Sequence, residues 1–364
     1  MDVYLFMDLA PNKRGPVELQ VLEMCRQSQD LGISLRFFFS GPPADWFMEE
    51  LLAAGYTAER FSRNGPEKIV EFCRSHSPEI VHFHFGSQFH VANRLRAMGI
   101  HVIRSEHSYR SSGWWTPAAS VRRHWRARGV SDFIAVSHYI ARQTRRDFLV
   151  SSRRITTIYN GTDLQRFQPG NAMDATSARR DLGLDAGPVV SMVAHLHHAK
   201  RQLLLLEAMK VIWKRDPRVQ LVLAGGGPDE SMLRAASSAA GGPVKLFTGN
   251  NDVAQIYHAS DLAVLPSTGE GLPGSAIEAL ACGVPVVVTA AGGLGEVPTH
   301  GVSGLIVDGA TPESLGAAIE ALLGDERLRT WMSGEARKRA IEVFDIRRTA
   351  RETLEFYSTR SPRD

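Results

Sequence analysis

Residues 265–289 read LPSTGEGLPGSAIEALACGVPVVVT and join a strand end, a glycine-rich turn, a helix and a second strand. Leu265 closes an apolar run, the turn follows it, and helical periodicity starts at Ser275. Another apolar run, Pro285–Thr289, begins the next strand. Because ligands of open parallel sheets bind outside the carboxyl ends of strands, this strand-to-helix loop is the first place to expect a binding site.

The same alternation extends over most of the chain. Short apolar runs alternate with segments of helical periodicity from residue 3 to residue 148, and again from residue 189 to residue 344. This pattern predicts α/β structure with parallel sheets covered by helices on both faces. Single cores rarely grow beyond about 250–300 residues, so 364 residues predict two doubly wound domains with a cleft between them.

The composition changes near residue 165, where glycine and proline become frequent, and this places the domain linker. We expect a first domain over residues 1–168 and a second over residues 169–344. Residues 345–364 are expected to form a C-terminal helix that crosses back to the first domain.

Charge and cysteine content exclude several classes of protein. Cys25, Cys73 and Cys282 are far apart and form no CxxC pair, which argues against a disulfide framework or a zinc site and favours a reducing compartment. The net charge of +3 is too small for a dedicated nucleic-acid binder. The N-terminus has no signal-peptide pattern, so we expect a cytoplasmic protein.

Two carboxylates, Glu270 and Glu278, stand close to the start of the helix in the opening stretch. A helix N-terminus offers backbone N–H groups and partial positive charge, which suit phosphate, while carboxylates accept hydrogen bonds from hydroxyl groups. Solvated carboxylates that favour the helix dipole are the plainer alternative. A nucleotide sugar, the donor in sugar transfer, is a ligand with both phosphate and hydroxyl groups. We expect Gly271, Leu272, Gly274 and Ser275 to be among the residues that bind it.

The stretch from Glu270 to Pro285, followed by Gly292-Gly293 and Glu296, resembles the retaining glycosyltransferases of family four, or group 1. Weaker matches extend the resemblance over almost the whole chain. It implies the GT-B fold, in which two Rossmann-like domains face each other across a cleft. It also implies that Glu270 contacts the donor sugar and Glu278 the ribose hydroxyls.

The family also has a basic pair after the first strand of its second domain. Here Lys200 is kept, but His195 stands where arginine is common, so diphosphate binding is expected to depend on Lys200 or to recruit Arg201. Since a charge-assisted hydrogen bond contributes about 1.5–3 kcal/mol, a neutral histidine would supply less. The family's glycine-rich N-terminal loop is represented by Gly15 alone.

The resemblance implies sugar transfer with retention, without a metal ion or other cofactor, from a UDP- or GDP-sugar to a glycan or lipid-linked acceptor in surface polysaccharide or lipopolysaccharide synthesis. His107 is expected near the reaction centre, so the expected catalytic residues are Glu270, Lys200 and His107. His82 and His84 are interpreted as structural, not as a metal pair. Trp114 and Trp115 fit an acceptor loop or a core equally well, and Gly225–Gly227 is expected to form a strand-to-helix turn.

Residues 122–154 carry nine arginines against Asp132 and Asp147. This basic segment is either an ordinary solvated surface or a surface that contacts an anionic membrane or acceptor. Two other functions stay open: a nucleotide-sugar epimerase, for which no acid–base set is found, and a non-catalytic subunit that binds a sugar nucleotide. A glycogen-type synthase would usually have a longer chain.

Overall fold

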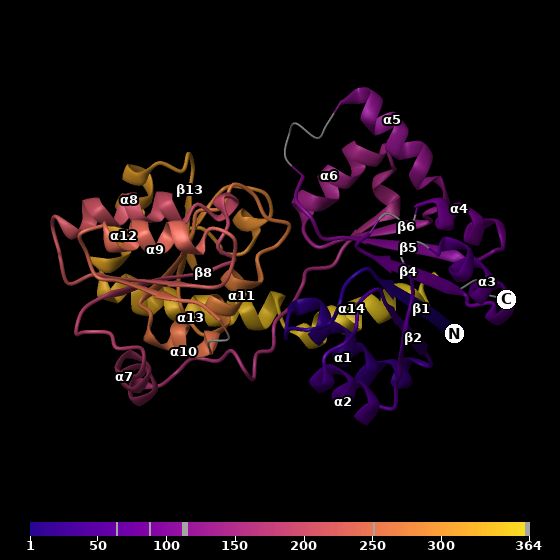
Figure 1. The fold of residues 1–364 in the computed structure, drawn as a ribbon, viewed down its shortest axis with the longest axis horizontal. Helices are drawn as coiled ribbons and strands as arrows, with labels where there is room; N and C mark the ends of the chain where they lie inside the picture. The colour runs from indigo at the N-terminus through magenta and orange to yellow at the C-terminus, as the bar shows by residue number, and fades with distance from the viewer. Residues whose placement is uncertain (63–64, 87–88, 111–115, 250–251, 361–364) are drawn as a thin grey trace. The chain divides into compact units, whose positions relative to one another are not determined.

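The computed structural model describes residues 1–62, 65–86, 89–110, 116–249 and 252–360. The chain forms two compact units: Met1–Gly161 with the C-terminal helix α14 (Ile346–Ser358), and Thr162–Asp345. The first unit therefore ends seven residues before the boundary expected at residue 168. Figure 1 shows α14, in yellow, beside the indigo helix α1 (Pro16–Ser28), to which Gln20 Nε2 and Thr353 Oγ1 link it at 3.0 Å.

The first unit is built on a seven-stranded parallel sheet with the order β3-β2-β1-β4-β5-β6-β7. Its strands are β1 (Asp2–Met7), β2 (Ser34–Phe39), β3 (Ala58–Arg60), β4 (Ile80–His84), β5 (His101–Glu106), β6 (Asp132–Ala135) and β7 (Ile155–Thr157). Its other helices are α2 (Asp45–Ala53), α3 (Pro66–His76), α4 (Phe89–Ala97), α5 (Pro117–Arg126) and α6 (His138–Phe148). The strand order reverses between β1 and β4, which makes a topological switch point there.

The two faces of this sheet pack into separate cores. Successive side chains of a strand point to opposite faces, so Val3 and Leu5 pack with α1, α2 and α14, while Tyr4 and Phe6 pack with α3, α4 and α6. β1 is buried along all but its first residue. Burial on both faces explains why this strand reads as a continuous apolar run.

The second unit has a six-stranded parallel sheet with the order β10-β9-β8-β11-β12-β13. Its strands are β8 (Val189–Val193), β9 (Gln220–Ala224), β10 (Val244–Phe247), β11 (Leu262–Leu265), β12 (Val286–Thr289) and β13 (Gly304–Val307). Its helices are α7 (Ala172–Asp181), α8 (Gln202–Trp213), α9 (Glu230–Ser238), α10 (Val253–Ala259), α11 (Gly274–Ala281), α12 (Pro312–Leu323) and α13 (Glu326–Val343). β8 and β11 are neighbours at the switch point.

Both sheets confirm the doubly wound α/β architecture expected from the sequence. The edge strands β3 and β7 were not expected, because each has only three residues and none of them is buried. Helix α7 lies in the glycine- and proline-rich segment, where Asn171 and Asp174 form a capping box that starts it.

No helix within the described ranges is long and apolar enough to cross a membrane. Trp114 and Trp115 lie outside the described residues.

Candidate active site

The candidate site of the second unit lies at the switch point between β8 and β11. Leu262 pairs with Val190 and Ala263 with Ser191, so both strands end at the same edge of the sheet. The loop after β8 ends in a short 3-10 helix, His198–Lys200, and the loop after β11 carries Glu270. The strand order therefore brings two residues 70 positions apart in the sequence to one place.

Lys200 and Glu270 form an ion pair between Nζ and Oε1. The two side chains are 26% and 15% exposed, so the pair is partly shielded from water and still open to a ligand. The two loops are also joined through the backbone, because Thr268 N–H donates to the carbonyl of Ala199 at 2.8 Å. This arrangement holds one cation and one carboxylate together at the carboxyl edge of the sheet.

The backbone of Glu270 is held by the glycine pair after β12. Gly293 N–H donates to the Glu270 carbonyl at 2.8 Å, and Gly292 forms an isolated parallel bridge with Glu270. Gly292 has φ +70°, and a Cβ atom there would lie 2.3 Å from the Glu270 carbonyl oxygen. Only glycine fits both the conformation and the space, so Gly292 positions Glu270.

Glu278 lies on α11, one turn after the loop that carries Glu270. Its side chain is partly buried, and burial raises its pKa to about 7 although Arg166 opposes the shift. Tyr257, from α10, lies close to Glu278 and donates its hydroxyl to the Ser275 carbonyl at 2.7 Å. Glu278 can therefore change protonation state near neutral pH, a property that its sequence position did not reveal.

The start of α11 supplies backbone donors. Pro273 is the N-cap and makes no side-chain capping bond, so the first N–H groups of the helix, those of Gly274 and Ser275, have no partner within the helix. Gly271 and Leu272 immediately precede this terminus, and both are buried. All four predicted donor-binding residues of this loop thus lie at one helix end, next to Glu270.

The structure places His195 and Arg201 in the same loop as Lys200. His195 is exposed, and its carbonyl accepts a hydrogen bond from Gln202 Nε2 at 2.9 Å. Its ring stacks with that of His197 at a centroid distance of 6.3 Å. Arg201 adopts the left-handed conformation, with φ +60°, directly before α8.

Gly225–Gly227 forms the turn after β9 that the sequence predicts, and the structure adds its reason. A Cβ atom at Gly225 would lie 2.0 Å from the Ala194 carbonyl oxygen, and one at Gly227 would lie 2.2 Å from that of Leu196. Leu196 N–H donates to the Gly226 carbonyl at 3.0 Å. These glycines allow the β9 turn to support the loop that carries Lys200.

The first unit holds the other two predicted residues. Gly15 is the N-cap of α1, in the loop after β1. His107 follows β5, and its Nε2 lies 3.2 Å from His84 Nδ1 while its ring stacks on Phe85 at 4.4 Å. Burial lowers the pKa of His107 to about 4, so this imidazole is neutral at pH 7.

His82 and His84 support the same edge from within β4. His82 Nε2 lies 2.8 Å from Ser105 Oγ, and its Nδ1 lies 2.5 Å from the hydroxyl of Tyr357 on α14. Burial lowers the pKa of His82 to about 3 and that of His84 well below its usual range. The two imidazoles are therefore neutral buried groups at pH 7.

Family models match both units of the chain. The model for glycosyl transferases group 1 matches residues 174–339, and the model for glycosyltransferase family 4 matches residues 17–166. The chain belongs to the group 1 glycosyltransferases. The resemblance based on Glu270 and Glu278 is confirmed at the level of the family.

Curated relatives of this glycosyltransferase include two D-inositol 3-phosphate glycosyltransferases. The protein from Rhodococcus opacus (strain B4) is 34% identical over 227 residues, which cover 59% of this chain and 50% of the relative. The protein from Geodermatophilus obscurus is 29% identical over 373 residues, which cover 90% of this chain and 81% of the relative. The matched region thus spans about half the length of the first relative.

Solved structures show the same fold. Anabaena HepE in complex with UDP has a TM-score of 0.85 at 20% identity, and the match covers 99% of this chain and 100% of HepE. WaaG, a glycosyltransferase involved in lipopolysaccharide biosynthesis, has a TM-score of 0.71 at 13% identity, with 98% and 99% covered. The GT-B fold is therefore confirmed for this glycosyltransferase.

Proposed function

We propose that the chain transfers a sugar from a nucleoside-diphosphate sugar to an acceptor, with retention of configuration and without a metal ion. The observation that carries this proposal is the Lys200–Glu270 pair, which lies beside the α11 N-terminus at the switch point of the second sheet. The cation and the helix terminus there suit a diphosphate, and the carboxylate suits sugar hydroxyls. The UDP and UDP-glucose complexes of Anabaena HepE, which shares the fold, support a nucleotide-sugar donor.

In this proposal the diphosphate binds between Lys200 and the N–H groups at the start of α11. Fixed positive charge is needed there because the bond from the anomeric carbon to the phosphate oxygen breaks and leaves negative charge on the diphosphate. Arg201 and His195 lie in the same loop as Lys200 and would add hydrogen-bond donors to the diphosphate. Lys200 is thus assigned to stabilising the leaving group.

Glu270 and Glu278 are assigned to hydroxyl groups of the donor. Glu270 would accept from the transferred sugar once Lys200 has turned toward the diphosphate, and Glu278 would accept from the ribose. An ionised carboxylate has only acceptor sites, so it suits hydroxyl partners and disfavours phosphate. Gly292 keeps the Glu270 backbone in the position that this contact needs.

His107 and Gly15 are assigned to the first unit's part of the reaction, His107 assisting near the reacting carbon and Gly15 lying close to the donor. The acceptor hydroxyl attacks the anomeric carbon on the face that the diphosphate leaves, and the departing phosphate oxygen takes the hydroxyl proton. A neutral His107 can then donate or accept one hydrogen bond without bringing a charge.

For the acceptor we propose a class of molecule. Relatives that are D-inositol 3-phosphate glycosyltransferases, and WaaG of lipopolysaccharide biosynthesis among the structural neighbours, support an acceptor that is either a small phosphorylated molecule or a surface glycan. We place the chain in the cytoplasm, with its basic segment 122–154 suited to contact with an anionic membrane surface.

The first test is a thermal-shift screen of UDP, GDP, ADP and their common sugars. A ligand at about 100 times its Kd stabilises the native state by about 2.7 kcal/mol, so the cognate nucleotide should raise the Tm clearly. Donor turnover is then followed as release of nucleoside diphosphate, with and without candidate acceptors. Binding without turnover on any acceptor would favour the non-catalytic subunit, and conversion to an isomeric sugar nucleotide would favour the epimerase.

A further inference from the structure

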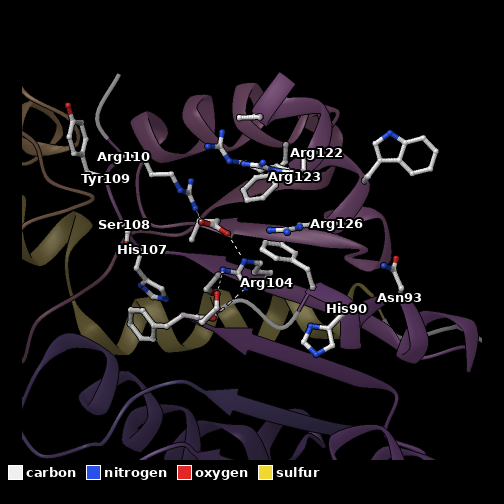
Figure 2. A pocket seen from close by; sticks show the side chains of 18 of the residues that line it. His90, Asn93, Arg104, His107, Ser108, Tyr109, Arg110, Arg122, Arg123 and Arg126 are labelled. Carbon is white, nitrogen blue, oxygen red and sulfur yellow. Dashed lines mark hydrogen bonds and ion pairs between the residues drawn. The ribbon is translucent and has the colours of Figure 1, made fainter. Parts of the chain in front are cut away.

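A cavity of about 1460 Å³ lies within the first unit, and His107 and Phe85 are among the residues that line it. It is bounded by the carboxyl end of β5 and by residues of α4, α5 and α6. Figure 2 shows that guanidinium groups surround this space. The arginines that line it are Arg104, Arg110, Arg122, Arg123 and Arg126.

The carboxylates near this cavity do not balance its arginines. Glu106 is the carboxylate that lines it, and Arg104 Nε binds Oε1 at 2.6 Å while Arg110 Nη2 binds Oε2. Asp147 lies behind the cavity wall, 3.7 Å from Arg110 Nη1 and 3.0 Å from Arg146 Nε. These two carboxylates are held by Arg104, Arg110 and Arg146, so the charges of Arg122 and Arg126 are left to be balanced by a group from outside.

Two of the arginines already have structural roles. Arg104 donates to the carbonyl of Gly86 at 2.8 Å, and this holds the turn after β4 in which Phe85 has φ +60°. Burial would raise the pKa of Glu106, but Arg104 and Arg110 together hold that pKa below its usual value. Glu106 therefore stays ionised and bound to its two arginines, so it forms part of the wall.

Arg122 and Arg126 are the groups available to a ligand. They stand four residues apart on α5, so both project from the same face of the helix, and both are exposed. In the part of the chain that the structure describes, neither makes a hydrogen bond or an ion pair. Burial lowers the pKa of the neighbouring Arg123; Asp147 opposes this shift, while Arg110 and Arg122 add to it, as expected where positive charge is crowded.

We propose that this pocket binds a phosphomonoester or diphosphate group of the acceptor. Guanidinium groups present planar pairs of donors that match phosphate oxygens, and a group with two negative charges would balance the charges of Arg122 and Arg126. The aromatic rings of Phe89, Trp125 and Phe148 line the same cavity and leave apolar surface for the rest of the molecule. The assignment of this group to the acceptor rests on the proposed function, whereas the anion site itself does not.

The test is a calorimetric titration of inorganic pyrophosphate into the full chain, with UDP present at saturation to occupy the donor site. The variant is Arg122→Gln/Arg126→Gln. Its matched control, Arg142→Gln/Arg145→Gln, removes two exposed arginines of α6 that do not line the cavity. We expect pyrophosphate to bind at least tenfold more weakly to the α5 variant, with less than a twofold change in the control.

Equal loss in the two double variants would show general electrostatic attraction and overturn the proposal, as would wild-type protein that binds no pyrophosphate at millimolar concentration. Repeating the titration on Lys200→Ala without UDP separates the two sites. If Lys200→Ala binds pyrophosphate while the wild type binds no UDP, the proposed function is wrong and the anion pocket is still supported. Farnesyl diphosphate against glucose 6-phosphate then distinguishes a lipid-borne from a soluble source, since the cognate source should bind at least tenfold more tightly.

Discussion

The hydroxyl of Tyr357, on the C-terminal helix α14, lies 2.5 Å from Nδ1 of His82 in the middle of the first sheet. Both side chains are fully buried, and the other ring nitrogen of His82 lies 2.8 Å from Ser105 Oγ. The contact joins segments 275 residues apart in the sequence. It ties the last helix to the strand that precedes Phe85 and the pocket.

Replacing Tyr357 with phenylalanine should therefore destabilise the first unit. The change leaves His82 Nδ1 buried without its partner, which costs about 1–3 kcal/mol. Urea denaturation would measure the loss, and Ser358→Ala, at an exposed neighbour on α14, should stay within about 0.5 kcal/mol of wild type. A Tyr357→Phe variant as stable as wild type would show that the contact contributes nothing.

Gly292→Ala should weaken donor binding through Glu270. The new Cβ atom would lie 2.3 Å from the Glu270 carbonyl oxygen, so the loop has to move. Gly301 has almost the same left-handed φ, +74°, but no atom lies within 4 Å of a Cβ built there. Gly301→Ala is therefore the control for backbone strain, which costs about 1–2 kcal/mol at either position.

We expect both glycine variants to lose stability in urea and only Gly292→Ala to lose affinity for the donor nucleotide, by about tenfold or more. Similar nucleotide affinities in the two variants would mean that the Glu270 backbone position does not matter for binding.

The raised pKa of Glu278 predicts a pH dependence of nucleotide binding. The folded protein holds the proton up to about pH 7, and only the ionised carboxylate has all its acceptor sites open to the ribose hydroxyls. Affinity for the nucleotide should therefore rise with pH through about 7, and Glu278→Gln should remove that part of the rise. Arg166, Tyr257 and Cys282 surround this group and are unchanged in the variant.

Calorimetric titrations of the nucleotide into both proteins across this pH range make the comparison, since titration of the nucleotide itself is common to both. The raised pKa of Glu278 also predicts how the stability of the fold changes with pH. Because the native state binds a proton that the unfolded chain releases, the Glu278 contribution falls as pH rises from about 4 to about 7. If nucleotide affinity depends on pH in the same way in wild type and Glu278→Gln, the assignment of Glu278 to the ribose is wrong.

Much of the fold follows from local sequence. Strands buried on both faces read as apolar runs, as β1 does, and helices such as α6 (His138–Phe148) are found at their expected bounds. The three-residue edge strands β3 and β7 carry no such signal, since none of their residues is buried. Their pairing depends on the neighbouring strand, which a local pattern does not contain.

The candidate site could be predicted only in part. Glu270 and Glu278 were predicted from their place near a helix start and Lys200 from the family resemblance, but the contact between Lys200 and Glu270 depends on the strand order that puts β8 beside β11. The pocket lined by Arg122 and Arg126 was harder to predict from the sequence than the Lys200–Glu270 site. The basic segment was visible in the sequence, yet its meeting with Arg104 and Arg110 depends on how α5 packs over the sheet.

The measurement that tests the central claim most directly is the rate at which Lys200→Ala releases nucleoside diphosphate from the cognate donor sugar. Without Lys200, one fixed positive charge beside the leaving diphosphate is lost, and the rate should fall by about 10²–10³-fold. Lys210→Ala, at an exposed lysine of α8 paired with Glu207, should stay within twofold of wild type. Equal release rates in wild type and Lys200→Ala would contradict a donor site built on the Lys200–Glu270 pair.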